Sequence, residues 1–352
     1  MEETIQSTIE ESYGVKLFEM VQTYRGVQFS VQNRPDQRYL LKPAGCPIHR
    51  IVYTYACMRY LYDCQYTGTE LYLLTKENVP YILIGNTPYI AVPVLRGREC
   101  SMEEKQDVIK AAGELARMHM AGRGFTSSKA MEYVKKYLPE HYDREGFVRV
   151  DAGKMPGLFA RRCAELQRFQ RMAKKSANPF DCAYSKLAPE NIQKAETICR
   201  KLSQGVYEKA LSKCMAEGFI CHKDYTGHNI LFTGSKTFIL NFDQCAIDLP
   251  ICDLANLIKR YMRKCGWDAD NAWDVIDAYG TVRNLAVEEY LLLQLILAFP
   301  QKLWRVVNKY YNSRKTWCEK SCLLKLQEIQ GEQGALDSFL ESLDKRFSQV
   351  YH

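Results

Sequence analysis

The chain has 352 residues, of which 47% are apolar and 25% charged, a mixture typical of soluble globular proteins. This composition excludes a disordered, collagen-like or coiled-coil chain, and the length predicts two lobes or one large domain. The 48 Lys and Arg residues against 41 Asp and Glu residues leave a net charge of +7. Such a mild excess suits an anionic partner such as a nucleotide without establishing one.

Residues 1–95 predict a small lobe of strands and turns around one helix. The runs 24–32 and 38–42 are β-type, and residues 33–36 between them have the composition of a turn. Apolar residues recur at helical spacing over 47–63. A second hairpin is predicted from the runs 81–84 and 89–95. The boundary of this lobe is expected at residues 96–99.

Residues 96–352 predict a larger, mostly helical lobe. Ser101 and Glu104 have the spacing of a capping box, in which the two side chains accept hydrogen bonds from backbone N–H groups at a helix start. This first helix is expected to end near His119. A long helix is predicted over 196–218. The further predicted helices cover 253–264, 269–279, 288–299, 302–311 and 320 to near the end. The polar segment 129–189 has no firm periodicity and stays unassigned, and a small hairpin is expected within 229–242.

Fourteen cysteines are spread along the chain without a C-x-x-C pair. The closest two, Cys318 and Cys322, lack a nearby second Cys or His pair that would complete a tetrahedral zinc site, so no zinc is expected. The acidic first residues lack the basic start of a signal peptide. The longest apolar stretch, 290–299, is too short to cross a bilayer. These features predict cytoplasmic synthesis, reduced cysteines and no membrane partner.

The most informative stretch is 219–243. It contains the pattern His-x-Asp-x-x-x-x-Asn, formed by His222, Asp224 and Asn229, and then a tight hairpin. Phosphoryl transfer needs a carboxylate that accepts the proton of the attacking hydroxyl, and oxygen ligands that hold Mg²⁺ against the phosphates. Asp224 and Asn229 can supply these two roles. The spacing alone arises by chance, but its place between a long amphipathic helix and a hairpin makes it more specific.

This stretch resembles the phosphotransferase branch of the protein-kinase-like fold, which holds aminoglycoside phosphotransferases and choline kinases. Within that branch the chain is most similar to the spore coat protein S family of endospore-forming bacteria. The closer likeness also rests on Arg-Tyr-Leu-Leu-Lys at 38–42 and on the segments 97–100, 115–119 and 248–254. The resemblance implies an α+β, bilobal protein-kinase-like fold. It has a small antiparallel-sheet N-lobe (1–95) with one main helix and a larger, mostly helical C-lobe (96–352) with a catalytic-loop hairpin (219–243).

The resemblance also implies roles for single residues of the catalytic loop. Asp224 matches the catalytic base, and His222 matches the histidine that braces the loop. Asn229 matches the secondary metal ligand. Asp253 matches the aspartate that supports the loop through hydrogen bonds.

ATP and Mg²⁺ are the cofactors that the resemblance implies. Lys42, at a strand end before a helix, matches the lysine that reaches the nucleotide phosphates. Gly26 is the one glycine near the first hairpin, where the family has a phosphate loop. Val94 belongs to the segment 92–97, which corresponds to the hinge against which adenine packs.

Two departures from the family pattern predict impaired chemistry, as in a pseudokinase. The main metal-binding aspartate aligns with Asn241, whose amide offers an oxygen but no charge. Unit charges about 4 Å apart interact by roughly 4 kcal/mol at an effective dielectric of about 20, so the lost charge weakens metal binding by roughly three decades. Asp243 is the candidate substitute, expected on the same strand face as Asn241. The second departure is that residues 47–62 hold no acid to pair with Lys42.

Simpler interpretations remain open. Lys42 is alternatively an exposed lysine closing a strand, His222 and Asp224 a structural pair in a turn, and Asn241 a satisfied strand-end amide. The basic residues at 161–162 and 174–175 are expected on a solvated helix face, and they are too poorly interleaved with aromatic residues for a nucleic-acid partner. The 23 tyrosines are expected in the core and rim, or alternatively as contacts in an assembled coat.

The leading functional hypothesis is a sporulation-associated spore coat protein, made in the mother cell and incorporated into the coat with other coat proteins. Its phosphotransferase scaffold would be a binding or assembly module that holds ATP and Mg²⁺ weakly or not at all. The alternative is an active ATP-dependent phosphotransferase acting on a small-molecule hydroxyl. In that case Asp224 is the base and Lys42 contacts the phosphates.

Overall fold

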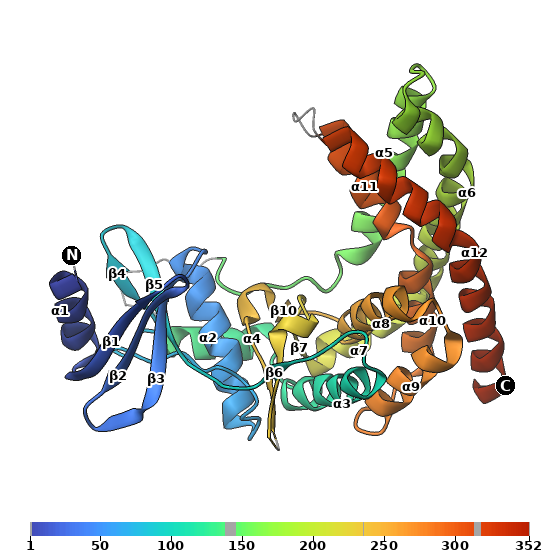
Figure 1. Ribbon diagram of the computed structural model, residues 1–352. Helices are drawn as coiled ribbons and strands as arrows, with labels where there is room; N and C mark the ends of the chain where they lie inside the picture. Colours follow the sequence, from blue (N-terminus) through green and yellow to red (C-terminus); the bar gives the residue numbers. More distant parts are fainter. Residues whose placement is uncertain (1, 138–145, 235, 313–317, 352) are drawn as a thin grey trace.

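The computed structural model describes residues 2–137, 146–234, 236–312 and 318–351. An antiparallel sheet with its helices forms the N-terminal part, drawn in blue and cyan at the left of Figure 1, and a larger, mainly helical part follows it. The predicted α+β fold of the kinase-like type is therefore confirmed. None of the helices in the described ranges is both long and apolar enough to span a membrane.

The N-terminal sheet has the strand order β1-β2-β3-β5-β4. Its strands are β1 (Leu17–Thr23), β2 (Gly26–Val31), β3 (Arg34–Pro43), β4 (Ile82–Ile84) and β5 (Thr87–Pro93). Both predicted hairpins form, although the β2–β3 turn falls at residues 32–33 and the rest of the expected turn continues β3. Strand β1 and the first helix, α1 (Glu2–Tyr13), were not expected from the sequence.

Alternating residues of the central strands bury the two faces of this sheet, as the period of two along a strand requires. Ala91 packs in one apolar cluster with Ile9 and Tyr13 of α1. Ile90 and Val92 pack in a different cluster with α2 (Ile48–Asp63), the helix predicted over 47–63. The sheet therefore lies between α1 and α2, and Lys42, which pairs with Ile90 in the register of β3 and β5, lies on the α2 side.

The larger part is built from ten helices of the described chain and two small sheets. The helices are α3 (Lys105–Ala121), α4 (Ser127–Lys136), α5 (Met155–Ala173), α6 (Pro179–Lys201), α7 (Tyr207–Glu217), α8 (Ile251–Cys265), α9 (Ala269–Gly280), α10 (Val287–Ala298), α11 (Gln301–Asn312) and α12 (Cys318–Tyr351). Strands β6 (Arg98–Glu99), β8 (Ile230–Thr233) and β9 (Lys236–Ile239) form one sheet, and β7 (Ile220–Cys221) pairs with β10 (Ala246–Ile247).

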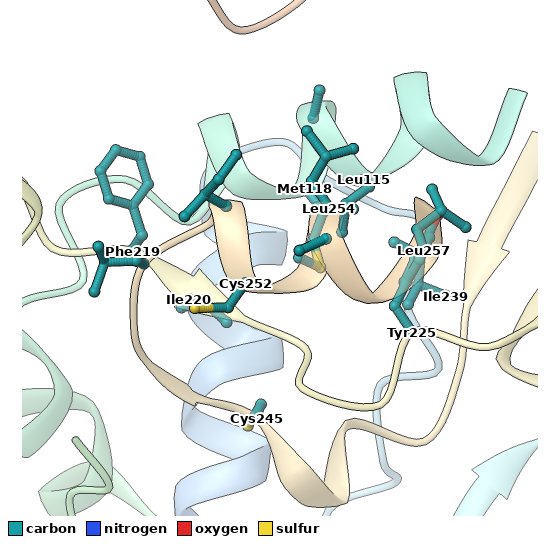
Figure 2. Close-up of a cluster of buried hydrophobic side chains, with 14 of the residues drawn as sticks. Leu115, Met118, Phe219, Ile220, Tyr225, Ile239, Cys245, Cys252, Leu254 and Leu257 are labelled. Carbon is teal, nitrogen blue, oxygen red and sulfur yellow. The ribbon is translucent and has the colours of Figure 1, made fainter. Parts of the chain in front are cut away.

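The core of the larger part holds the stretch 219–243 in place. In Figure 2, Leu115 and Met118 of α3 and Leu254 and Leu257 of α8 belong to one cluster of buried side chains that also surrounds β7. Tyr225, buried in the same cluster, donates its hydroxyl to the carbonyl oxygen of Ala111 at 2.8 Å. The loop after β7 is thus anchored on a rigid base formed by α3 and α8.

The predicted capping box at Ser101 and Glu104 is wrong. Helix α3 begins directly after Glu104, which caps it without a side-chain hydrogen bond. The backbone N–H of Ser101 instead donates to the Asp107 carboxylate at 2.9 Å, and Arg98 also binds this carboxylate. Since Asp107 already organises the turn before the helix, the Ser101 side chain does not cap it.

The segment 129–189, unassigned from sequence, is largely helical in its described residues, and the single helix predicted over 196–218 is broken. Gly205 has φ +96° within a π-helical segment, Leu202–Val206, which separates α6 from α7. Side chains of α5 and α6 pack with α11 and α12 in a second apolar cluster. These helices form the projection at the upper right of Figure 1.

Candidate functional site

A cavity of about 680 Å³ lies between the N-terminal sheet and the β8–β9 hairpin. Val92 and Val94 contribute apolar lining from the sheet side, and Leu231 and Leu240 contribute it from the hairpin side. The volume lies within the usual range of small-molecule sites, and the two apolar walls suit a flat ring placed between them. Val94, which the sequence analysis placed in the segment expected to contact adenine, lines this cavity.

Lys42 enters the same cavity from β3 and is partly buried there. Its Nζ donates to Oδ1 of Asn241 at 3.4 Å, across the gap between the two parts of the molecule. Lys42 is therefore not simply an exposed residue at a strand end.

A directed chain of hydrogen bonds continues from Asn241. Its Nδ2 donates to Oδ1 of Asn229 at 2.7 Å, and Asn229 Nδ2 donates to the backbone oxygen of Asp224 at 2.9 Å and to its Oδ2 at 3.3 Å. The lysine at one end can only donate and the ionised carboxylate at the other can only accept, so the network itself sets the orientation of both amides. The structure thus brings together four of the residues singled out from sequence: Lys42, Asn241, Asn229 and Asp224.

Asp224 lies at the open end of this chain. Its side chain is 49% exposed, and its Oδ1 is 3.6 Å from Nη2 of Arg260. A half-exposed carboxylate next to an internal hydrogen-bond chain can reach a hydroxyl that approaches from solvent, as general-base catalysis requires.

His222 and Asp253 hold the loop that carries Asp224. Nε2 of His222 bonds to the Leu240 oxygen at 2.8 Å, and its Nδ1 accepts the N–H of Asp224 at 3.2 Å. Asp253 accepts the backbone N–H of His222 at 2.6 Å and of Lys223 at 2.9 Å, and Lys223 has φ +69°. Burial lowers the pKa of His222, so the ring is neutral, as its single-donor bonding pattern requires. The proposed bracing roles agree with these contacts.

His119, Cys221 and Asp253 bring three ligand-type atoms within 4.8 Å of one another in the core. His119 already bonds to the Tyr279 hydroxyl at 2.8 Å and to Asp253 at 3.4 Å. Burial raises the pKa of the Cys221 thiol well above its usual value, and metal binding needs the thiolate. This cluster is therefore better described as a hydrogen-bonded brace than as an open metal site.

Glu70 is a site residue that the sequence analysis missed. It lines the cavity, is 6% exposed, and its Oε1 accepts the backbone N–H of Asn241 at 2.7 Å. Burial raises its pKa, and the nearby charge of Lys42 opposes that rise. Glu70, in the segment after α2, thus places an acid close enough to Lys42 to feel its charge, although the two side chains form no ion pair within 4.0 Å. Neither periodicity nor a motif marks this residue in the sequence.

A close backbone approach delivers Glu70 to the site. The carbonyl oxygen of Gly68 accepts the N–H of Ile239 in β9 at 2.8 Å. A Cβ on Gly68 would lie 2.9 Å from the Tyr66 ring and 3.0 Å from the Thr237 oxygen. Glycine is needed here because any side chain would push the segment carrying Glu70 away from the hairpin.

Asp243 and Gly26 do not line the cavity. Asn241 has φ +58° and is followed by a 3₁₀ turn, so the continuing strand expected over 241–243 is wrong, and Asp243 instead accepts the Tyr72 hydroxyl at 3.3 Å. Gly26 has φ +140°, and a Cβ there would lie 2.2 Å from the Leu41 oxygen. Its glycine permits close contact of β2 and β3, while the neighbouring Arg25 faces the cavity.

The sequence profile of the phosphotransferase enzyme family matches residues 56–283. The chain belongs to this family. It is 26% identical over 220 residues to spore coat protein S of Bacillus subtilis (strain 168), a match that covers 60% of this chain and 63% of that protein. The predicted resemblance to spore coat protein S within the phosphotransferase fold is confirmed.

Solved structures support the fold. An aminoglycoside phosphotransferase of Alicyclobacillus acidocaldarius has a TM-score of 0.80 and 20% identity, with 98% of this chain and 96% of that chain covered. A spectinomycin phosphotransferase in complex with ADP and spectinomycin has a TM-score of 0.56 and 11% identity, with 97% and 98% covered. The GDP complex of an aminoglycoside 2'-phosphotransferase has a TM-score of 0.54 and 12% identity, with 94% and 98% covered.

Proposed function

We propose that this protein is a spore coat component whose phosphotransferase cleft binds a nucleotide with little phosphoryl transfer. The similarity to spore coat protein S supports the coat assignment. The nucleotide-bound relatives of the same fold support the choice of ligand. In this proposal the nucleotide lies between lobes 1–95 and 96–352, with Val94 at the base and Lys42 at the phosphates, and other coat proteins are the assembly partners.

The hydrogen bond from Asn241 Nδ2 to Asn229 Oδ1 carries the proposal of impaired catalysis. With an aspartate at 241, two oxygens would face each other here, an arrangement that is favourable when a cation lies between them. In this chain the amide N–H takes the place of that cation. The residues that would hold Mg²⁺, Asn229 and Asn241, satisfy each other without it, and the pair brings no negative charge to attract a divalent ion.

Thermal-shift titration with ATP, with and without Mg²⁺, tests this proposal together with the Asn241→Asp variant. Because a ligand that binds the native state raises apparent stability by RT ln(1+[L]/Kd), millimolar ATP should raise the Tm of the wild type about equally with and without Mg²⁺. In Asn241→Asp the shift should depend on Mg²⁺, with metal affinity higher by roughly two to three decades at an effective dielectric of about 20.

Asn284→Asp is the matched control, since Asn284 is exposed in the loop before α10, away from the cleft. It should behave as the wild type does. A strongly Mg²⁺-dependent shift in the wild type, or an Asn241→Asp variant without one, contradicts the metal argument. No shift with ATP under any condition contradicts nucleotide binding.

An active phosphotransferase is the second candidate, and Glu70 is the observation that favours it. This carboxylate lies beside Lys42 and Asn241 in the cavity, where it can replace the charge absent at position 241. Asp224 is open to a small-molecule hydroxyl.

The Glu70→Gln variant separates the two candidates. If Glu70 is only the counter-charge of Lys42, its neutral isostere should tighten ATP binding, because a negative charge leaves the phosphate site. If Glu70 is a metal ligand, the same variant should weaken MgATP binding and abolish any ATP hydrolysis or transfer measured with the wild type.

A further inference from the structure

A second cavity, of about 610 Å³, lies on the other side of the loop that carries Asp224. Residues of α5, α8 and α11 line it, together with the end of α10 and residues 151–154 before α5. Arg260 lines this cavity and is also the residue 3.6 Å from Asp224. The cavity therefore begins where the hydrogen-bond chain from Lys42 ends.

The lining of this cavity is strongly basic. Its cations are Lys154 and Lys223 and a cluster of six more, which we call the basic cluster: Arg161, Arg162, Lys259, Arg260, Arg263 and Arg305. Two carboxylates, of Asp151 and Asp248, also line it. Both are already paired, Asp151 with Lys154 at 3.0 Å and Asp248 with Lys223. Both acids of the lining are therefore paired with lysines that do not belong to the basic cluster.

Acids outside the lining neutralise the basic cluster only in part, and Arg260 is paired with Asp224 at 3.6 Å. Within the part of the chain that the structure describes, Arg161, Lys259 and Arg305 have no carboxylate within 4.0 Å. Glu165 and Glu332 offset part of the charge at Arg162 and Arg263. Each is bound elsewhere, Glu165 to the Trp304 indole at 2.6 Å and Glu332 to Lys302 at 2.9 Å.

The cations of the cluster repel one another. Burial and the charges of Arg263, Arg305 and Arg162 lower the pKa of Lys259 to about 7. Burial and the charges of Arg305 and Arg161 lower the pKa of Arg162 to about 10. Like charges held this close are unfavourable without an anion, so the cluster is arranged for a ligand that supplies one.

Two members of the cluster, Arg162 and Lys259, are held in place by neighbouring groups. The Arg162 guanidinium stacks over the Trp304 ring at 4.3 Å and donates to Gln301 Oε1, while its buried Nε has no partner among the described residues. Lys259 Nζ donates to the carbonyl oxygen of Ile296. The rings of Phe159 and Phe299, stacked at 3.9 Å, give the cavity an apolar wall. Donors fixed in advance reduce the entropy lost on binding.

We propose that this cavity binds a small hydroxyl-bearing compound with two or more anionic groups, such as a sugar or polyol bisphosphate. The cations lie on three helices, so separate anionic groups can be bound at once, and the carbon skeleton can contact the aromatic wall. The same charges disfavour an aminoglycoside, whose amines are protonated. Although the ligand lies beside Asp224, its binding needs neither ATP nor catalysis and so goes beyond the proposed function.

Isothermal titration of the full chain with fructose 1,6-bisphosphate, in phosphate-free buffer without nucleotide, tests the proposal. Saturable one-to-one binding is expected, with affinity at least about tenfold higher than for inorganic phosphate because more charge-assisted hydrogen bonds form. Fructose and glucosamine should not bind. The double variant Arg260→Gln/Arg305→Gln should lose about tenfold or more in affinity. Both residues are exposed, so the fold should persist, as an unchanged Tm would verify.

Arg171→Gln/Arg200→Gln is the matched control, because it removes the same charge from exposed positions outside the cavity. It should leave the affinity unchanged. Equal losses in both double variants, or equal affinities for the bisphosphate and inorganic phosphate, would overturn the proposal. So would retention of polyphosphate without binding of the bisphosphate, which would indicate a polymer surface. Because no nucleotide is present, these results do not depend on whether the cleft beside Lys42 functions as proposed.

Discussion

The two cavities on either side of Asp224 differ in how their polar groups are satisfied. In the cleft, Lys42, Asn241, Asn229 and Asp224 form a continuous hydrogen-bond chain, and buried Glu70 balances the lysine. In the second cavity, six basic residues lie together, the lining acids are paired with other lysines, and Arg260 of the six is paired with Asp224. The first site is complete without a divalent ion, whereas the second lacks the negative charge that would complete it.

A substituted residue at a family position and an unusual cluster of like charges therefore give different evidence about ligand binding. Asn241 replaces a charged ligand with a neutral one and makes the cleft self-sufficient. The basic cluster concentrates charge at a cost to folding, since like charges repel. A cluster that destabilises the folded protein indicates a bound ligand more directly than a network in which every hydrogen bond is already made.

The largest expected effect is on the brace that holds the loop carrying Asp224. Asp253→Ala removes a fully buried carboxylate that accepts the N–H groups of His222 and Lys223. Leaving these buried donors unpaired should lower the free energy of unfolding by about 3–5 kcal/mol in urea denaturation. Asp270→Ala, at an 89% exposed side chain paired with Arg346, is the control and should have little effect. A loss for Asp253→Ala as small as the control's would show that the brace is not structural.

A smaller, pH-dependent effect is expected in the basic cluster. In the folded protein the pKa of Lys259 is about 7, below its ordinary value of about 10.4, so above pH 7 the unfolded chain binds a proton that the folded chain lacks. The proton on Lys259 therefore favours the unfolded chain, and raising the pH weakens this destabilisation of the folded protein. Lys259→Met should therefore be more stable than the wild type near neutral pH, and its advantage should shrink above pH 7 by at most about 1.4 kcal/mol per pH unit.

Urea denaturation at several pH values between 6 and 9 measures this difference, with Lys209→Met on the exposed face of α7 as control. The control should show no such slope. A pH-independent difference between Lys259→Met and the wild type would mean that burial and the neighbouring arginines do not lower the pKa of Lys259.

The smallest expected effect on stability lies at Asp224, at the end of the hydrogen-bond chain. Its side chain is half exposed and its nearest cation, Arg260, is 3.6 Å away and also exposed. Asp224→Asn keeps an oxygen for Asn229 and should change the free energy of unfolding by no more than about 0.5 kcal/mol in the same urea measurement. A loss above about 1 kcal/mol would place Asp224 with Asp253 as a structural residue.

The cleft was predictable from sequence where its residues are close along the chain. His222, Asp224 and Asn229 share one loop, so their spacing alone indicates a shared site. Lys42 was predicted as a site residue from its place at a strand end before a helix. Glu70 could not be found in this way, because an irregular segment and the glycine at 68 bring it to the hairpin through tertiary contacts. Local torsions at Asn241 likewise redirected Asp243 away from the strand face assumed for it.

The basic cavity was not predictable because its cations are far apart in sequence. Arg162 was expected on a solvated helix face, yet it is half-buried against Trp304 of α11. The helices of the segment 129–189 were missed since their buried residues pack against α11 and α12 and their other faces are polar. The false capping box at Ser101 shows the converse error, a local pattern overridden by Asp107.

The direction of hydrogen bonding through Asn241 has a genetic consequence. Codons for asparagine and aspartate differ in their first base alone, so a single transition would replace the donating amide by an accepting carboxylate. That base change would turn a hydrogen-bonded pair of side chains into two oxygens that repel each other unless a cation binds both. One base change at codon 241 is therefore enough to give a cleft that favours a metal ion, because the surrounding backbone is already in place.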